Sequence, residues 1–331
     1  MNKKMITIGA CCVSIVLACF TGCGHKTQQT DSAESSDTVS VEHNNITFNA
    51  DSAYQYIADQ VAFGARVPGS KAHKACAEWM EAKFTNWGHQ VIVQNADLKA
   101  YDGTILPSKN IIVSINPQNK QRILLMAHWD TRPVADQDPD PKKRKTPILG
   151  ADDGASGVGV LMEMARQYAI DKPSVGVDIV LFDSEDYGTP NDDNSWCLGS
   201  QYWAKNPHAP GYTADFGILL DMVGSKDATF FYEGYSKIYA SRILNLVWDT
   251  ASRLGYGKFF KQSDGGTMTD DHVPVIKELK IPCIDIINYS NENSKGFGDY
   301  WHTHEDNMNI ISTETLRAVG HTVMTVIKEY K

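Results

Sequence analysis

Short apolar runs alternate with amphipathic segments along most of the chain. In residues 52–64, Tyr54, Ile57 and Val61 recur at the spacing of one helix face, and residues 71–87 show a second pattern of this kind. Further helices are predicted over residues 155–169, 196–205, 236–254 and 313–330. Buried strands are predicted at the apolar runs of residues 110–115, 122–127, 178–182, 216–220 and 281–287.

This order of elements predicts the fold class. Strands that alternate with helices form a mostly parallel central sheet with helices on both faces. There is no internal repeat and no Pro/Gly-rich linker after residue 50, so we expect a single α/β domain. In open sheets of this kind, the functional site lies beyond the carboxyl ends of the strands.

The first residues follow a different pattern. Lys3 and Lys4 precede an apolar run over residues 5–20, which is too short for a stable membrane span and is typical of an export signal. The run leads to Cys23, in a context that resembles a bacterial lipobox; Cys19 is a second candidate, and an ordinary secretory signal is the alternative.

The segment that follows is polar and poor in large apolar residues. We therefore predict a lipoprotein signal peptide at residues 1–23, a disordered tether at 24–44 and a folded catalytic domain at 45–331. The expected location is the bacterial cell envelope, with the protein exported and lipid-anchored on the periplasmic side or at the surface.

Charge and cysteine content exclude some functions. The net charge of -9 argues against a nucleic-acid partner, and the basic run at residues 142–145 lies between two prolines in a predicted solvated loop. Beyond the tether only Cys76, Cys197 and Cys283 remain. This sparse, odd set predicts neither a disulfide framework nor a zinc knuckle, although one bridge could form in an oxidising compartment.

Metal-ligand residue types follow several predicted strands. Each one alone has an ordinary explanation, such as a helix cap, but their convergence at four strand ends indicates a metal site. The residues are His128, Asp130, Asp152, Asp153, Glu185, Asp186, Asp221 and His302. Zinc binds His nitrogen and carboxylate oxygen, and a catalytic zinc keeps three protein ligands and one open position. If the strand persists, Glu185 and Asp186 point in opposite directions, so one could bind metal while the other moves protons.

Taken in order, these motifs resemble the zinc aminopeptidase superfamily, which is built on a parallel-sheet α/β core, over residues 50–331. Within it, four stretches are similar to the animal-type glutaminyl-peptide cyclotransferases, or glutaminyl cyclases. They are residues 66–70 (RVPGS), 220–224 (LDMVG), 270–274 (DDHVP) and 301–303 (WHT).

The resemblance implies specific roles. Zinc would be held by Asp153, Asp186 and His302. Glu185 would transfer protons, Asp221 and Asp270 would complete a carboxylate network, and Trp301 would line a small apolar pocket. Aminopeptidase relatives usually carry Ser at the position of Asp270, whereas both groups carry the aspartate at the position of Asp271. Which of the two aspartates belongs to the carboxylate network stays open.

Several positions depart from the family pattern or leave alternatives open. The pair Glu185-Asp186 replaces the Glu-Glu of well-known cyclases, so the ligand has a shorter arm. Trp196 falls near, but not on, the expected position of a pocket tryptophan, so it either lines the pocket or packs in the core. His128 and Asp221, which bind a second zinc in the peptidases, are both retained, so the metal count stays open.

The resemblance implies a zinc-dependent cyclase that converts the N-terminal glutamine of peptides or proteins to pyroglutamate with release of ammonia. We expect one zinc ion per chain, a monomer, and membrane contact only through the lipid anchor. The main alternative is a dizinc aminopeptidase that hydrolyses the N-terminal peptide bond. A lipid-anchored binding protein with a degenerate site is a third hypothesis, which the intact Glu185 disfavours.

Overall fold

The computed structural model describes residues 47–291 and 296–331. The predicted signal peptide and tether, with Cys19 and Cys23, lie outside the described residues and stay predictions. Within the described ranges, no helix combines the length and the apolar character that crossing a membrane requires. All described residues belong to one compact unit that spans Asn44–Lys331.

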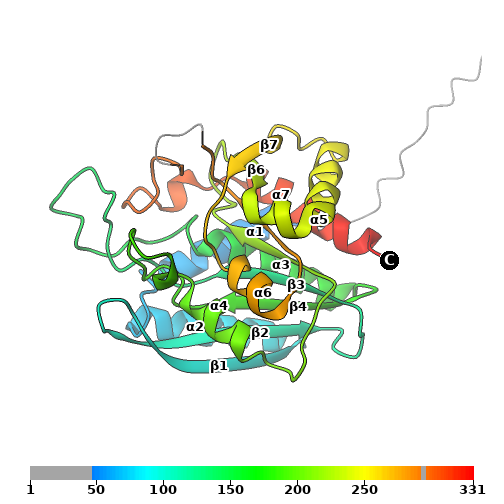
Figure 1. Ribbon diagram of the computed structural model, residues 1–331, viewed down its shortest axis with the longest axis horizontal. Coiled ribbons are helices and arrows are strands. Elements are labelled where there is room, and N and C mark those ends of the chain that lie inside the picture. The colour runs from blue at the N-terminus through cyan, green and yellow to red at the C-terminus, as the bar shows by residue number, and fades with distance from the viewer. Residues whose placement is uncertain (1–46, 292–295) are drawn as a thin grey trace, which may run out of the picture. The chain divides into compact units, whose positions relative to one another are not determined.

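A six-stranded sheet runs through this unit in the order β1-β2-β4-β3-β5-β8 (Figure 1). β4, β3, β5 and β8 pair in parallel, whereas β2 pairs antiparallel with both β1 and β4. The prediction of an α/β fold is confirmed, and the sheet is mixed because the β1–β2 hairpin extends its edge. Its strands are β1 (Gln90–Lys99), β2 (Ile105–Ile115), β3 (Arg122–His128), β4 (Gly176–Phe182), β5 (Phe216–Asp221) and β8 (Cys283–Ile287).

Both faces of the sheet are covered, as predicted. Ile123 and Leu125 of β3 point into one hydrophobic cluster, while Leu124 between them points into the other. The larger cluster is formed with α1 (Ala50–Ala62), α2 (Lys71–Asn86), α3 (Ala155–Ile170), α5 (Gly234–Arg253) and α7 (Thr313–Glu329). The smaller one is formed with α4 (Leu198–Lys205) and α6 (His272–Leu279).

Side-chain caps fix where several helices begin. Asn49 accepts from the backbone amides of Asp51 and Ser52 at the start of α1, and Ser70 caps α2 through the amide of His73. α4 begins at Leu198, so Trp196 precedes the helix that was expected to contain it. A two-stranded sheet of β6 (Phe230–Glu233) and β7 (Phe260–Gly266), the strand β1 and the helix α6 are elements that the apolar pattern did not predict.

The start of α3 approaches the sheet very closely. Gly154 has a φ of 101°, and a side chain there would lie 2.6 Å from the carbonyl oxygen of Asp130. At Gly157 a Cβ would lie 2.1 Å from the carbonyl oxygen of Leu220. These two glycines let the loop that carries Asp153 lie against the ends of β3 and β5.

The three cysteines of the described part are buried and free. Cys76 lies in α2, Cys283 opens β8, and Cys197 precedes α4. The single bridge that an oxidising compartment could have allowed is therefore not present among them.

Candidate active site

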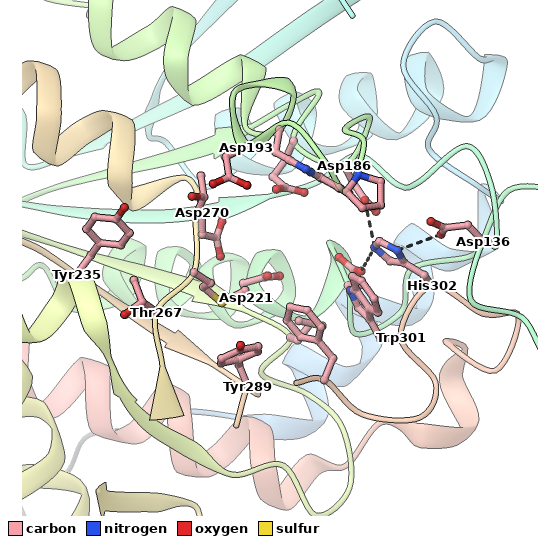
Figure 2. A pocket seen from close by; sticks show the side chains of 18 residues that line it. Asp136, Asp186, Asp193, Asp221, Tyr235, Thr267, Asp270, Tyr289, Trp301 and His302 are labelled. Atoms are coloured by element: carbon pink, nitrogen blue, oxygen red, sulfur yellow. Dashed lines mark ion pairs between the residues drawn. The ribbon is translucent and has the colours of Figure 1, made fainter. Parts of the chain in front are cut away.

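A cavity of about 540 Å³ opens at the carboxyl ends of the parallel strands (Figure 2). His128, Asp130 and Asp152 are not part of its lining, but the lining includes each residue, from residue 153 to residue 302, to which the family resemblance gave a catalytic, pocket or first-metal role. Those residues are Asp153, Glu185, Asp186, Trp196, Asp221, Asp270, Trp301 and His302. The placement follows the rule that such sites form where parallel strands end.

Asp153, Asp186 and His302 form one group of possible metal ligands. One ligand atom from each lies within 4.8 Å of the others, and all three residues are buried. Nε2 of His302 lies 3.4 Å from Oδ1 of Asp186 and 3.7 Å from Oδ2 of Asp153. Oδ2 of Asp186 is buried and has no hydrogen-bond partner among the described atoms. One imidazole nitrogen and two carboxylates, one with an unused oxygen, are a donor set that fits zinc.

An ion pair with the half-buried carboxylate of Asp136 orients His302 from behind. Nδ1 of His302 lies 3.1 Å from Oδ1 of Asp136. Arg132 holds that carboxylate with two donors, Nε at 2.8 Å and Nη2 at 2.9 Å, and its Nη1 donates to the backbone oxygen of Asp186. Arg132 therefore connects the histidine support to the carboxylate ligand, as outer residues of metal sites commonly do.

His128, Asp153 and Asp221 form a second group of ligand types. Nε2 of His128 lies 3.1 Å from Oδ1 of Asp153 and 3.1 Å from Oδ1 of Asp221. This group shares Asp153 with the first one, and all three residues are buried. These three residues are therefore close enough together to hold a second metal ion.

Two buried carboxylates fix the backbone of the site. Asp130 accepts from the amides of Glu185 and Asp186 at 3.1 and 3.2 Å. Asp306 accepts from the amides of Asp152 and Asp153 at 2.7 and 3.1 Å. The main chain at both candidate carboxylate ligands is thus held by charge-assisted hydrogen bonds from elsewhere in the sequence.

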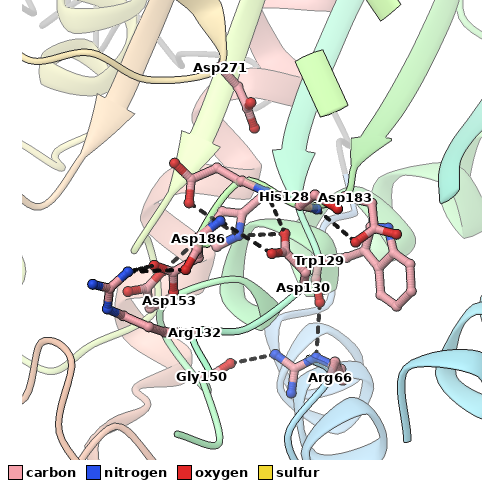
Figure 3. Close-up of polar contacts among 12 residues, drawn as sticks. Arg66, His128, Trp129, Asp130, Arg132, Gly150, Asp153, Asp183, Asp186 and Asp271 are labelled. Atoms are coloured by element: carbon pink, nitrogen blue, oxygen red, sulfur yellow. Dashed lines mark hydrogen bonds and ion pairs between the residues drawn. The ribbon is translucent and has the colours of Figure 1, made fainter. Parts of the chain in front are cut away.

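Arg66 performs a similar role for the loop before α3. It is fully buried, and its guanidinium donates to the carbonyl oxygens of Trp129, Leu149 and Gly150 at 3.0, 2.7 and 2.7 Å (Figure 3). These bonds join the end of β3 to the loop that presents Asp153. These hydrogen bonds give a structural reason for the arginine in the RVPGS stretch at residues 66–70.

The carboxyls of Glu185, Asp221 and Asp270 all line the cavity and influence one another. The pKa of Asp221 is raised to about 7, because burial, together with nearby Asp270, outweighs the opposite effect of His128. Burial also raises the pKa of Glu185 well above its usual range, with added contributions from Asp186 and Asp270. A carboxyl with a pKa of about 7, such as that of Asp221, exchanges protons near neutral pH, which suits acid–base chemistry.

The structure separates Asp270 from Asp271. Asp270 lines the cavity, whereas Asp271 is fully buried at the start of α6 and is not part of the lining. Figure 2 shows Asp270 pointing toward the cavity near Asp221. By placement, Asp270 is the one that can face a bound molecule.

Aromatic rings enclose the ligand side of the cavity. Trp301 stacks on Phe297, with ring centroids 4.4 Å apart. Trp196 stacks beside His302 at 6.2 Å, and its Nε1 donates to the carbonyl oxygen of Thr189. Trp196 therefore lines the pocket and does not pack in the core. It does so from a sequence position near, but not on, the one expected for the pocket tryptophan.

Sequence reasoning missed the residues that support this site. Arg132 and Asp136 lie in the loop after β3, which carried no periodic signal. The one available hint was an acidic residue four positions after an arginine, a spacing too common to be decisive. Cys197, which donates its thiol hydrogen to Glu185, was considered only as a possible disulfide partner.

Comparison with known proteins agrees with this geometry. Residues 110–327 match the sequence profile described as peptidase family M28. The crystal structure of Porphyromonas gingivalis glutaminyl cyclase is 57% identical, with a TM-score of 0.85, and the match covers 86% of this chain and 99% of that one. A Zn-dependent exopeptidase from Parabacteroides distasonis is 55% identical, with the same TM-score and the same two coverages.

Among curated proteins, the glutaminyl-peptide cyclotransferase of Bos taurus is 26% identical over 255 residues. That match spans 67% of this chain and 66% of the bovine protein. The M28 profile covers well over half of the present chain, including both groups of ligand types. The chain therefore belongs to peptidase family M28.

Proposed function

We propose that this protein is a zinc-dependent glutaminyl-peptide cyclotransferase. It converts the N-terminal glutamine of peptides or proteins to pyroglutamate and releases ammonia. One observation carries the proposal: Glu185 and Asp270 line the same cavity as the Asp153, Asp186 and His302 group. The similarity to a solved glutaminyl cyclase over nearly all of that protein's chain supports it.

A bound zinc ion would supply Lewis acidity, which polarises the amide carbonyl of the glutamine side chain. The nucleophile is the α-amine of the substrate, so no Ser or Cys nucleophile is needed. In the reaction the amine nitrogen bonds to the amide carbon, and the bond from that carbon to the amide nitrogen breaks. An unperturbed α-amine has a pKa of about 7.7–8.0, so a useful fraction is neutral near pH 7.

Glu185 takes the proton from the attacking amine and returns it to the departing nitrogen, which leaves as ammonia. Asp221 and Asp270 keep this exchange local because crowded carboxyls share protons rather than all ionising. Trp301, Trp196 and Phe297 bound the space for the folded glutamine side chain. Holding amine and amide in one reactive geometry is a proximity effect, which the enclosed cavity provides.

The local geometry favours a single zinc ion. Nε2 of His128 is within hydrogen-bond distance of Asp221, so this pair is satisfied without a metal. By contrast, the contacts of 3.4 and 3.7 Å around Nε2 of His302 are longer than good hydrogen bonds. In the group formed by Asp153, Asp186 and His302, the buried Oδ2 of Asp186 has no hydrogen-bond partner among the described atoms, so this oxygen is available to an ion.

A dizinc aminopeptidase is the second candidate, because His128, Asp153 and Asp221 remain together. The similarity to the Zn-dependent exopeptidase from Parabacteroides distasonis is consistent with it. Metal analysis of the purified protein separates the two candidates: about one zinc ion per chain agrees with the cyclase, and about two agree with the peptidase.

The experiment that tests the proposal compares two peptides with the same sequence. One begins with a free glutamine, and the other carries an acetyl group on that α-amine. A cyclase converts the first to the pyroglutamyl product and leaves the second intact, because its nucleophile is blocked. Loss of the amide from both peptides would contradict intramolecular attack by the amine.

We also propose that the enzyme is exported, lipid-anchored through Cys23 and monomeric, and that it acts on proteins reaching the cell envelope. The support is the charged and apolar pattern of residues 3–20 and the polar stretch after Cys23. Labelling with a fatty acid analogue should mark the wild-type chain and not the Cys23→Ser variant. Persistent labelling of that variant would contradict anchoring at Cys23.

A further inference from the structure

A buried cysteine contacts the proton-transfer residue. Sγ of Cys197 lies 3.4 Å from Oε1 of Glu185 and donates its hydrogen to that oxygen. Cys197 is only 1% exposed, so solvent competes little for the contact. The other carboxylate oxygen of Glu185, Oε2, lies 4.0 Å from Nδ1 of His128. The two oxygens of Glu185 therefore have different neighbours.

The backbone fixes the thiol relative to Glu185. The amide of Cys197 donates to the carbonyl oxygen of Glu185 at 3.0 Å, and the amide of Leu198 donates to that of Ser184 at 3.1 Å. A Cβ at Gly199 would lie 2.0 Å from the carbonyl oxygen of Asp183, so the start of α4 packs directly on the segment after β4. The two segments are thus joined at three consecutive positions.

The local conformation directs the side chain inward. Cys197 adopts a left-handed conformation with φ of 57°, just before α4 begins. Burial, followed by the nearby charge of Glu185, raises the pKa of the thiol well above its usual range. The sulfur consequently keeps its hydrogen and acts as a donor rather than as a thiolate.

We propose that Cys197 is a positioning residue, whose thiol holds the Glu185 carboxylate in one rotamer at the edge of the cavity. Without a donor at this point, the flexible glutamate side chain samples other rotamers and is less often in place for proton transfer. The effect on turnover rests on the proposed function, whereas the effect on the Glu185 rotamer does not. The residue is not a nucleophile and does not touch the substrate.

The test compares Cys197→Ala with Cys197→Ser in the full chain. Alanine removes the donor, and serine restores one of similar size; both keep a Cβ, so neither gains the freedom that glycine would have at a φ of 57°. For a peptide that begins with glutamine, we expect the alanine variant to lose about three- to ten-fold in kcat with KM unchanged. The serine variant should recover most of that loss.

Cys283→Ala is the matched control. Cys283 is also buried and donates to a backbone carbonyl, that of Ile281, but it lies outside the cavity lining. Its removal should leave kcat unchanged. An unchanged kcat in Cys197→Ala, or an equal loss in the serine variant, would overturn the proposal.

Crystal structures of the two variants give a readout independent of the reaction. Glu185 should occupy more than one rotamer in Cys197→Ala and a single, wild-type rotamer in Cys197→Ser. An unmoved Glu185 in the alanine variant would overturn the positioning role. If the wild-type enzyme does not cyclise glutamine, the proposed function fails, and the rotamers still decide the role of Cys197.

Discussion

Nδ1 of His302 lies 3.1 Å from Oδ1 of Asp136, while Nε2 of the same ring faces Asp186 (Figure 2). The imidazole thus has one nitrogen directed to the candidate metal position and one held by a carboxylate. Such a partner fixes the ring orientation and the tautomer, and strengthens the histidine as a ligand. The affinity for zinc should therefore depend on a residue that does not bind the ion.

Replacing Asp136 by alanine should weaken zinc binding by about 10- to 100-fold. The loss arises because His302 is no longer oriented and Arg132 loses its bidentate partner. Competition with a chelator of known affinity measures the effect. Asp140→Ala, in the same loop but without contact to His302, is the control and should bind zinc as the wild type does. If the wild type and both variants bind zinc with equal affinity, Asp136 does not support His302 as a ligand.

Glu185→Gln should reduce turnover by at least about 100-fold, because the amide cannot accept the proton of the attacking amine. The metal content should stay at the wild-type value, since Glu185 lies outside the Asp153, Asp186 and His302 group. Steady-state kinetics and metal analysis on the same preparation check both points. A variant that loses its zinc would show that Glu185 is a ligand instead.

Arg66→Lys should lower the free energy of unfolding by about 2–4 kcal/mol. A lysine has one nitrogen in place of the three donors that reach Trp129, Leu149 and Gly150, so buried carbonyls lose their partners. Urea unfolding measures the change, and Arg253→Lys at an exposed ion pair is the control. If both variants unfold at the same urea concentration as the wild type, the loop before α3 does not depend on Arg66.

The ionisation of Glu233 should make the free energy of unfolding depend on pH. Burial acts to raise its pKa, but His272 and the amides at the start of α5 outweigh burial and lower the pKa to about 2. The folded pKa is thus below the unfolded value of 4.5, so the stabilisation is present above pH 4.5 and is lost as the pH falls toward 2. At pH 7 this carboxylate contributes about 3 kcal/mol.

Glu233→Gln should accordingly be destabilised at pH 7, and the difference from wild type should shrink steadily between pH 4.5 and pH 2. Urea unfolding of both proteins at pH 7 and pH 3 measures this, with exposed Glu278→Gln as the control. A difference from wild type that is the same at both values would contradict the ionised state of Glu233.

The sequence allowed the fold class and the site to be predicted where local patterns carry the information. Apolar runs such as residues 122–127 are buried on both faces, and the polar residue after each run marks a strand end. Polar or half-exposed strands gave no such signal. β7 (Phe260–Gly266) has one apolar residue, Phe260, followed by polar residues and glycines, and β1 has no fully buried residue.

The supporting contacts could not be predicted, because they join residues that are far apart in the chain. Arg66 reaches carbonyl oxygens 63 to 84 positions away. Backbone carbonyls have no residue type, so no motif marks them as partners. The pocket position of Trp196 likewise depends on the path of the loop after β4, which differs from the family pattern that the sequence was compared with.

The measurement that tests the central claim most directly follows two products from one reaction. The purified protein is incubated with a peptide that begins with glutamine, and ammonia and free glutamine are quantified over time. Cyclisation predicts ammonia in equal amount to a peptide that has lost the mass of one ammonia, with no free glutamine. Free glutamine with a shortened peptide and no ammonia would contradict the account and identify an aminopeptidase.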